Sequence, residues 1–213
     1  MSERYAQVEK RFEELQQLLC DPAVLADGER YRELAKENTR LMPAAQLCRR
    51  HRELTEELSL RLAPQQELTV VCGGNEELHA KLQKRFGDDR HMHIHGLVDN
   101  VPQLMHSADL FITKPGGLST TEAAACGLPM VLMDTVAGCE GHNLAFFLQR
   151  GGAVTADTPR LLADTAMALL ADPERLWAMS DALRPAEAQT PAEQIYDCLC
   201  RPQTRLDTAQ RYA

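Results

Sequence analysis

Short apolar segments alternate with amphipathic segments along residues 67–183, and this alternation constrains the fold more than any other feature of the sequence. The apolar segments that we predict to be strands lie at 67–72, 91–95, 109–113, 129–133 and 153–155. Predicted helices lie at 75–86, 101–108, 119–126, 142–150, 158–171, 173–183 and 191–200. Strands that alternate with helices at this short spacing indicate βαβ units and a parallel sheet.

The first 61 residues follow a different, purely helical pattern. Apolar side chains recur every three or four residues along 5–19 and again along 31–58, with charges of both signs on the other faces. Asp21 and Pro22 interrupt the first stretch, and Pro43 predicts a kink in the second. We therefore predict a helical hairpin, or a short coiled coil, before the α/β part of the chain.

The change of pattern also predicts the domain boundaries. They are a helical hairpin at 1–61, a linker at 62–66, an α/β domain at 67–200 and a tail at 201–213.

Composition and charge narrow the class of protein. Of the 213 residues, 44% are hydrophobic and 25% are charged, which is typical of a soluble globular protein. The net charge of −8 argues against a nucleic-acid partner. No apolar run approaches the roughly 18 residues that a membrane-spanning helix needs. The charged N-terminus does not have the pattern of a signal peptide.

The cysteines indicate a cytoplasmic, reducing environment. There are seven, an odd number, and none forms a CxxC pair, which favours free thiols over a disulfide framework. Cys198 and Cys200 form a CxC sequence near the end of the chain, which by itself is weak evidence for a redox or metal site.

A turn rich in glycine and hydroxyl groups, "KPGGLSTTEAAACGLP" at 114–129, is the strongest candidate for a binding site. Ligands of open parallel sheets bind at the carboxyl ends of the strands, and this turn follows such an end. A helix that begins here has free N–H groups and a partial positive charge in its first turn. Gly116 and Gly117 allow a ligand to approach the backbone, and Ser119 and Thr120 add hydroxyl donors. These features suit a phosphate or diphosphate.

Glu122 allows two interpretations of the same turn. One turn inside the helix, its carboxylate is placed to accept hydrogen bonds from a ribose diol. Alternatively, Ser119 is an ordinary N-cap and Glu122, three residues later, completes a capping box. The GK[ST] signature of a Walker loop is missing.

Three histidines alternate along one predicted strand. His91, His93 and His95 would share a face, which raises the question of a zinc site. The interpretation that we favour is a partly exposed strand with Met92 and Ile94 facing the core, and we expect no metal.

The segment "DLFITKPGGLSTTEAAACGLPMVLMDTVAGCEGHN" closely resembles the donor-binding half of GT-B glycosyltransferases of family 28. That family includes monogalactosyldiacylglycerol synthases, processive diacylglycerol glucosyltransferases and MurG-type N-acetylglucosaminyltransferases. The resemblance is specific from about Leu68 to Val154, and it includes "VVCGGNEEL" and "HGLVDNVPQLMHSAD". It implies a Rossmann-like parallel sheet, here an incomplete GT-B C-terminal domain, and a UDP-sugar ligand.

The resemblance assigns candidate donor-binding residues. Uracil would be faced by the backbone of Gly96, Leu97 and Val98. The diphosphate would be faced by Gly116, Gly117, Ser119 and Thr120. Glu122 would face the ribose, and Glu140 and Asn143 would face the hexose. The family's loop before the hexose-binding helix commonly reads proline-glycine-glutamine-glutamate. Here it reads Ala137-Gly138-Cys139-Glu140, which leaves the identity of the sugar open.

The activity that the resemblance implies is inverting transfer of a hexosyl group to a lipid acceptor such as diacylglycerol, without metal or cofactor. The family's catalytic base lies largely on an acceptor domain that has no counterpart here, so we identify no catalytic residue in this chain. We expect a truncated or fused chain, a partner chain that supplies the acceptor domain, and a location in the cytoplasm or at the inner face of the membrane. The alternative is a non-catalytic nucleotide-sugar-binding or helical interaction module.

The helical part resembles a second family. Residues 3–58 are similar to the start of bacterial peptide chain release factor 1. The GGQ tripeptide of that family is missing, since Gly73 and Gly74 are followed by Asn75. A ribosome-associated fragment is therefore a third hypothesis.

A strand of the family's sheet also has no counterpart. In the family, a strand, a glycine-rich loop and a helix precede the segment that matches "LTVVCGGN". The first strand of a doubly wound sheet lies in its middle. We therefore expect the strands on either side of it to lack ladder partners.

Overall fold

The computed structural model describes residues 2–133, 139–184 and 196. Residues 1–183 form one compact unit, and 184–213 form a second unit. Most of the second unit, including the helix predicted at 191–200 and the CxC sequence, lies outside the described residues.

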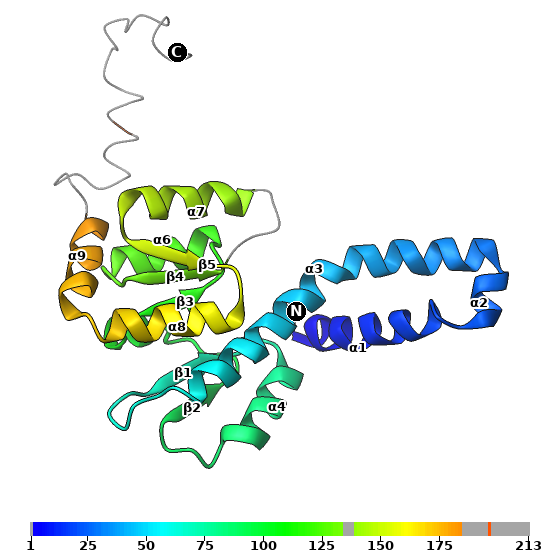
Figure 1. The fold of residues 1–213 in the computed structure, drawn as a ribbon, viewed down its shortest axis with the longest axis horizontal. Coiled ribbons are helices and arrows are strands. Elements are labelled where there is room, and N and C mark those ends of the chain that lie inside the picture. Colours follow the sequence, from blue (N-terminus) through cyan, green and yellow to red (C-terminus); the bar gives the residue numbers. More distant parts are fainter. Residues whose placement is uncertain (1, 134–138, 185–195, 197–213) are drawn as a thin grey trace, which may run out of the picture. The chain divides into compact units, whose positions relative to one another are not determined.

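Three helices form the N-terminal hairpin (Figure 1): α1 (Ser2–Leu18), α2 (Pro22–Ala26) and α3 (Gly28–Ser59). The predicted break at Asp21-Pro22 is confirmed, and it begins the short helix α2, because the Asp21 carboxylate accepts a hydrogen bond from the Ala23 amide at 2.8 Å. Asp27 caps α3 in the same way. Helix α3 continues through Pro43 for 32 residues, so this proline does not divide the second helix.

The α/β part has the predicted alternation of strands and helices. Its elements are β1 (Leu68–Val71), α4 (Glu76–Phe86), β2 (Met92–His95), α5 (Val101–Ser107), β3 (Phe111–Thr113), α6 (Gly117–Ala125), β4 (Met130–Met133), α7 (Cys139–Arg150), β5 (Ala153–Ala156), α8 (Pro159–Leu170) and α9 (Pro173–Leu183). The helix start at Asn75 is also confirmed, since its side-chain oxygen accepts from the Leu78 amide at 3.0 Å.

All strand pairs are parallel, and they form two separate ladders. Strand β1 pairs with β2, and the second sheet has the order β3-β4-β5. A doubly wound sheet has the order 3-2-1-4-5-6. In this order, the β1–β2 ladder corresponds to strands 2 and 3, and the β3-β4-β5 ladder corresponds to strands 4, 5 and 6. The position of strand 1, which would lie between β1 and β3, has no strand among the described residues. The expected loss of ladder partners is therefore confirmed for the described part of the chain.

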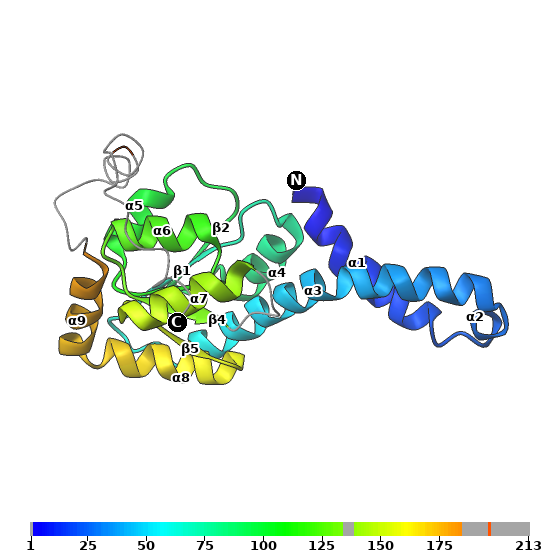
Figure 2. The ribbon, with the colours of Figure 1, turned by 90° about the horizontal axis from the view of Figure 1, so that it is seen from above.

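Helix α3 contributes to the core of the α/β part. Leu54 and Leu58 are each 6% exposed and belong to the same apolar cluster as Val131 of β4 and Leu162 of α8. Figure 2 shows the second half of α3 beside α8 and the strands. The two sides of the predicted 62–66 boundary therefore share one hydrophobic core.

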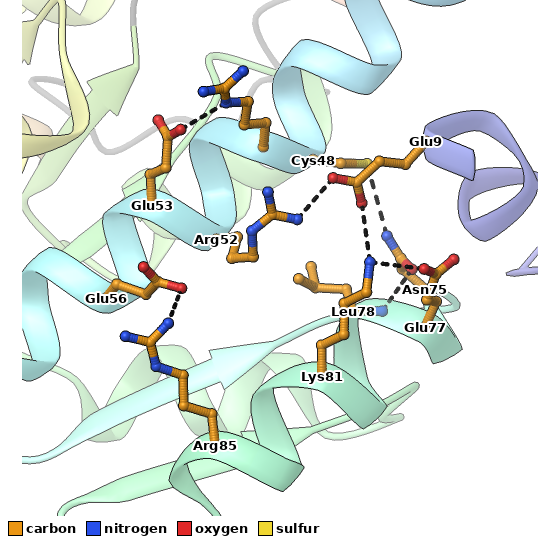
Figure 3. Close-up of polar contacts among 11 residues, drawn as sticks. Glu9, Cys48, Arg52, Glu53, Glu56, Asn75, Glu77, Leu78, Lys81 and Arg85 are labelled. Atoms are coloured by element: carbon orange, nitrogen blue, oxygen red, sulfur yellow. Dashed lines mark hydrogen bonds and ion pairs between the residues drawn. The ribbon is translucent and has the colours of Figure 1, made fainter. Parts of the chain in front are cut away.

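A network of charged side chains also joins the hairpin to α4 (Figure 3). The Glu9 carboxylate of α1 accepts from the Arg52 guanidinium of α3 at 2.8 Å and lies 3.9 Å from the Lys81 ammonium of α4. Arg85 of α4 is paired with Glu56 of α3. Three helices that are distant in sequence are thus connected on their polar sides.

No helix in the described ranges combines the length and the apolar composition that crossing a bilayer requires.

Candidate functional site

The glycine-rich turn after β3 begins helix α6 two residues earlier than predicted. Gly116 is the N-cap, with φ −74° and ψ 139°, and no side chain caps the helix. Ser119 is therefore the third residue of the first turn, and the alternative interpretation of Ser119 and Glu122 as a capping box is wrong. Because α-helical hydrogen bonds reach back four residues, the first N–H groups of α6 have no acceptor within the helix. The turn keeps the donors that an anion would use.

The threonine hydroxyls of α6 are bonded to its own backbone. Thr120 is fully buried, and its hydroxyl donates to the Gly116 carbonyl at 2.7 Å. Thr121 donates to the Gly117 carbonyl at 2.6 Å. Thr120 therefore stabilises the turn through its buried hydroxyl. Ser119 is half-buried, and Glu122 is exposed in the second turn.

The start of α7 lies beside this turn. The Asn143 amide donates to the Pro115 carbonyl at 3.0 Å, and a Cβ added to Gly117 would lie 3.8 Å from the Asn143 nitrogen. The Glu140 carboxylate lies 2.5 Å from the Lys114 ammonium. Strands β3 and β4 are parallel neighbours, so the loops that leave them meet at one edge of the sheet. The structure thus brings Glu140 and Asn143, two of the predicted site residues, to the predicted turn.

Lys114 is a candidate site residue that the sequence analysis missed. Its side chain is half exposed, and its Cε would lie 3.7 Å from a Cβ added to Gly116. The ammonium is therefore a partly exposed positive charge near the start of α6, where it is paired with Glu140. The signal in the sequence was the lysine that directly precedes Pro115 and the two glycines.

The predicted base-binding segment follows β2. A Cβ added to Gly96 would lie 4.0 Å from the Gly73 carbonyl, so this segment borders the turn after β1. Gly73 has a φ of +57°, a left-handed conformation that favours glycine. Leu97 is 84% exposed and Val98 is half-buried. Gly96, Leu97 and Val98 therefore lie at the carboxyl edge of the β1–β2 ladder.

Two of the three histidine rings, those of His91 and His93, contact different groups. The His93 ring lies 3.1 Å from the Glu67 carboxylate, and the His91 ring lies 3.1 Å from the Gln66 carbonyl. Met92 is buried and Ile94 packs on the same apolar cluster, as predicted for a partly exposed strand. The described residues contain no group of three side chains suited to hold a metal ion.

A surface pocket of about 230 Å³ lies at a different place in the fold. It is lined by Met105, His106, Ala108, Asp109, Cys126, Gly127, Leu128, Pro129, Leu176, Trp177 and Ser180. Several of these residues directly precede β3 and β4, so the pocket is at the amino ends of the strands. The turn at 114–117 follows a carboxyl end, and the pocket is therefore not part of that site.

Two residues of the predicted donor loop, Ala137 and Gly138, lie outside the described residues, which resume at Cys139.

Comparison with known proteins identifies the class to which this chain belongs. The family model for glycosyl transferases group 1 matches residues 44–172, and the chain is a member of that family. The match begins inside α3, earlier than the predicted start near Leu68. It therefore includes Leu54 and Leu58, the part of α3 that lies in the core.

Among curated proteins, the chain is similar to processive diacylglycerol beta-glucosyltransferases. It is 35% identical to that of Bacillus cereus (strain B4264) over 145 residues, which cover 66% of this chain and 37% of the relative. It is 32% identical to that of Staphylococcus saprophyticus over 124 residues, which cover 58% of this chain and 32% of the relative. The matched part of the chain thus spans about a third of the length of these relatives.

Proposed function

We propose that this chain binds a UDP-sugar at the start of α6, as the donor-binding part of a hexosyltransferase that acts on a lipid acceptor such as diacylglycerol. The observation that carries the proposal is the convergence of Lys114, Glu140 and Asn143 on an uncapped helix start in a member of this family. The relatives named above are diacylglycerol glucosyltransferases, and their name motivates the choice of acceptor.

In the proposed complex, the diphosphate lies against the first turn of α6. The backbone N–H groups at Gly117 and Ser119, the Ser119 hydroxyl and the Lys114 ammonium face its oxygens. Glu140 then exchanges its contact with Lys114 for a hydroxyl of the hexose, and Asn143 fixes the turn through the Pro115 carbonyl. Glu122 accepts from the ribose, and the backbone at 96–98 borders the base.

The chemistry follows from where charge develops. As the anomeric bond breaks, negative charge accumulates on the departing UDP, and fixed donors stabilise this charge more than that of the bound substrate. Removal of one such donor typically costs about 3 kcal/mol in the transition state. The Lys114 ammonium supplies compensating charge without a metal ion. The base that activates the acceptor hydroxyl comes from an acceptor domain on a partner chain.

The location and the competing hypotheses follow from the same proposal. We place the protein in the cytoplasm or at the inner face of the membrane, where the lipid acceptor is accessible. The chain matches only 37% of the B. cereus relative, so a non-catalytic nucleotide-sugar-binding module is the main alternative to an enzyme that acts alone. UDP binding without turnover would favour this alternative. A hairpin derived from release factor 1 would give a ribosome-associated protein that does not bind UDP.

Calorimetric titration with UDP, UMP and uridine tests the site. Lys114→Gln should weaken UDP binding about 10- to 100-fold, since a charge-assisted hydrogen bond contributes about 1.5–3 kcal/mol, and it should leave uridine binding unchanged. Lys84→Gln, an exposed lysine of α4, is the matched control. Glu122→Ala should weaken all three ligands through the ribose, and His93→Ala should weaken none.

Failure of the wild-type chain to bind UDP would refute the proposed function. Binding without any effect of Lys114→Gln and Glu122→Ala would refute the site but not the function. A turnover assay with UDP-glucose, UDP-galactose and diacylglycerol then distinguishes an enzyme from a binding module. It is run with and without the part of the B. cereus relative that lies outside the matched region.

A further inference from the structure

We infer that the gap between β1 and β3 is a binding site for one parallel β-strand that a different polypeptide donates. The inference concerns backbone groups rather than the nucleotide site, and it does not depend on the proposed activity. Edge strands present rows of free N–H and C=O groups, and an added strand is the partner that satisfies them.

The hydrogen bonds of β1 establish which of its backbone groups face the gap. The Leu68 amide donates to the His91 carbonyl and the Cys72 amide donates to the His95 carbonyl, both at 2.8 Å. Successive residues of a strand direct their backbone groups to opposite sides. Leu68, Val70 and Cys72 therefore face β2, whereas the N–H groups of Thr69 and Val71 face away from it.

The same argument applies to β3. The Phe111 amide donates to the Pro129 carbonyl at 2.9 Å, next to the pairing with β4. The N–H and C=O of Ile112 therefore face away from β4. No strand in the described part of the chain pairs with these sides of β1 and β3.

Burial supports an open edge at both strands. All four residues of β4 are buried, as expected for a strand with a neighbour on each side. In β3 all three residues are only half-buried, and in β1 Val71 is 38% exposed. Strands in the middle of a doubly wound sheet are covered on all sides. The exposure of side chains in β1 and β3 therefore indicates that a neighbouring element is absent beside these two strands.

The two open edges border the same space. Leu68 of β1 and Ile112 of β3 pack on one apolar cluster, which also contains Leu54 and Leu58 of α3. When the two ladders are compared with the six-stranded order of a doubly wound sheet, one strand position has no counterpart. That position lies between β1 and β3. One strand in that position would complete both ladders.

The site defines the chemistry of its occupant. The strand must be parallel to β1 and β3, about four residues long and free of proline, because both sides have to pair. Leu68 and Ile112 pack on one apolar cluster beside this position, so the side chains that the strand directs toward that cluster should be apolar, such as valine and isoleucine. The curated relatives contain nearly two thirds of a chain beyond the matched part, which makes a separate polypeptide the source that we favour.

Amide hydrogen exchange followed by NMR tests the inference on the intact chain. The amides of Thr69, Val71 and Ile112 should exchange at least a hundredfold faster than those of Val70 and Val131. The probe is a synthetic peptide that copies the 30 residues preceding the matched region in the B. cereus relative. At saturation it should slow exchange of the three gap-facing amides at least tenfold, and a scrambled peptide should not.

A matched pair of variants makes the test specific. Thr69→Pro removes a donor that faces the gap and should abolish the effect of the peptide while the chain remains folded. Thr69→Val keeps the donor and should leave the effect intact. Slow exchange of the three amides in the chain alone would contradict the inference, because the gap would already be filled.

Two further results would also overturn the inference. One is protection that rises with the concentration of the chain itself, which would identify a second copy as the occupant. The other is the absence of protection at saturating peptide, or equal protection by the scrambled peptide.

Discussion

The two halves of helix α3 are stabilised in different ways. The first half pairs with α1 and α2, and Leu15 and Val24 are the buried apolar side chains described in residues 8–43. Its polar contacts include a bidentate pair of Arg11 with Glu37, at 2.9 Å for each bond. The second half places Leu54 and Leu58 in a cluster with β4 and α8. One continuous helix thus belongs to two environments with very different amounts of buried apolar surface.

The difference shows that a boundary in sequence pattern need not be a boundary in packing. The pattern changes at 62–66, where helical periodicity gives way to strands. The core extends back into α3, and the family match begins at residue 44, next to Pro43. Helix α3 nevertheless continues without interruption across this point. The comparison predicts where the chain can be cut.

Two deletions should have the largest and most different effects. Removal of residues 1–43 leaves Leu54 and Leu58 in the core, so we expect cooperative thermal unfolding to persist. Removal of residues 1–61 loses both side chains, each worth about 2–5 kcal/mol, against a total stability of roughly 5–15 kcal/mol. We expect this variant to lose cooperative unfolding, as measured by circular dichroism and calorimetry. Equal behaviour of the two variants would show that α3 is dispensable to the core.

A single substitution tests the same contrast within the intact chain. Leu58→Ala should lower the free energy of unfolding by about 2–5 kcal/mol, because Leu58 is 6% exposed among β4 and α8 side chains. Leu25→Ala, in the hairpin, should lower it by less than about 0.5 kcal/mol, because Leu25 is 57% exposed. Urea denaturation measures both values. A smaller loss for Leu58→Ala than for Leu25→Ala would place the core elsewhere.

Local chemistry made the elements of the α/β part predictable. Every predicted strand and helix in the described residues was found, with ends that shift by a few residues. Asn75 could be recognised as an N-cap, because an asparagine before an amphipathic run satisfies a free amide. The split of the sheet was also predictable, since the order of a doubly wound sheet shows which strand is absent.

Contacts between distant segments were not predictable. The apolar periodicity along 31–58 predicted a face of α3 that could be buried, but it gave no indication that Leu54 and Leu58 reach β4 and α8. The pairing of Lys114 with Glu140 joins two loops that only the parallel sheet brings together. The start of α6 was misplaced because Ser119 looked like a cap, whereas Gly116 has that position. The burial of Leu54 and Leu58, the Lys114–Glu140 pair and the start of α6 all depend on tertiary packing.

The polar junction between the hairpin and α4 should contribute less than the apolar one. A double-mutant cycle on Glu9 and Arg52, with Glu9→Gln and Arg52→Gln, should give a coupling of about 1 kcal/mol or less, since ion pairs with solvent access are screened. The coupling should decrease in 1 M NaCl. Urea denaturation of the four proteins measures it. A coupling above about 3 kcal/mol would mean that the network in Figure 3, and not Leu54 and Leu58, holds the hairpin in place.

The smallest expected effect is the pH dependence of the hairpin. The hydrogen bonds from Arg11, and then its charge, lower the pKa of Glu37 below its ordinary value of 4.5. A lowered pKa in the folded state adds stability that is complete above pH 4.5 and is lost as the pH falls through the folded-state value. Glu37→Gln should therefore reduce stability slightly at pH 7 and match the wild type once the pH is below the folded-state pKa of Glu37. A matched variant, Glu33→Gln on the exposed face of α3, should show no such difference, and denaturation midpoints across pH compare the two. A difference that grows toward acid would show that the Arg11–Glu37 pair does not stabilise the hairpin, which would leave Leu15 and Val24 as its main support.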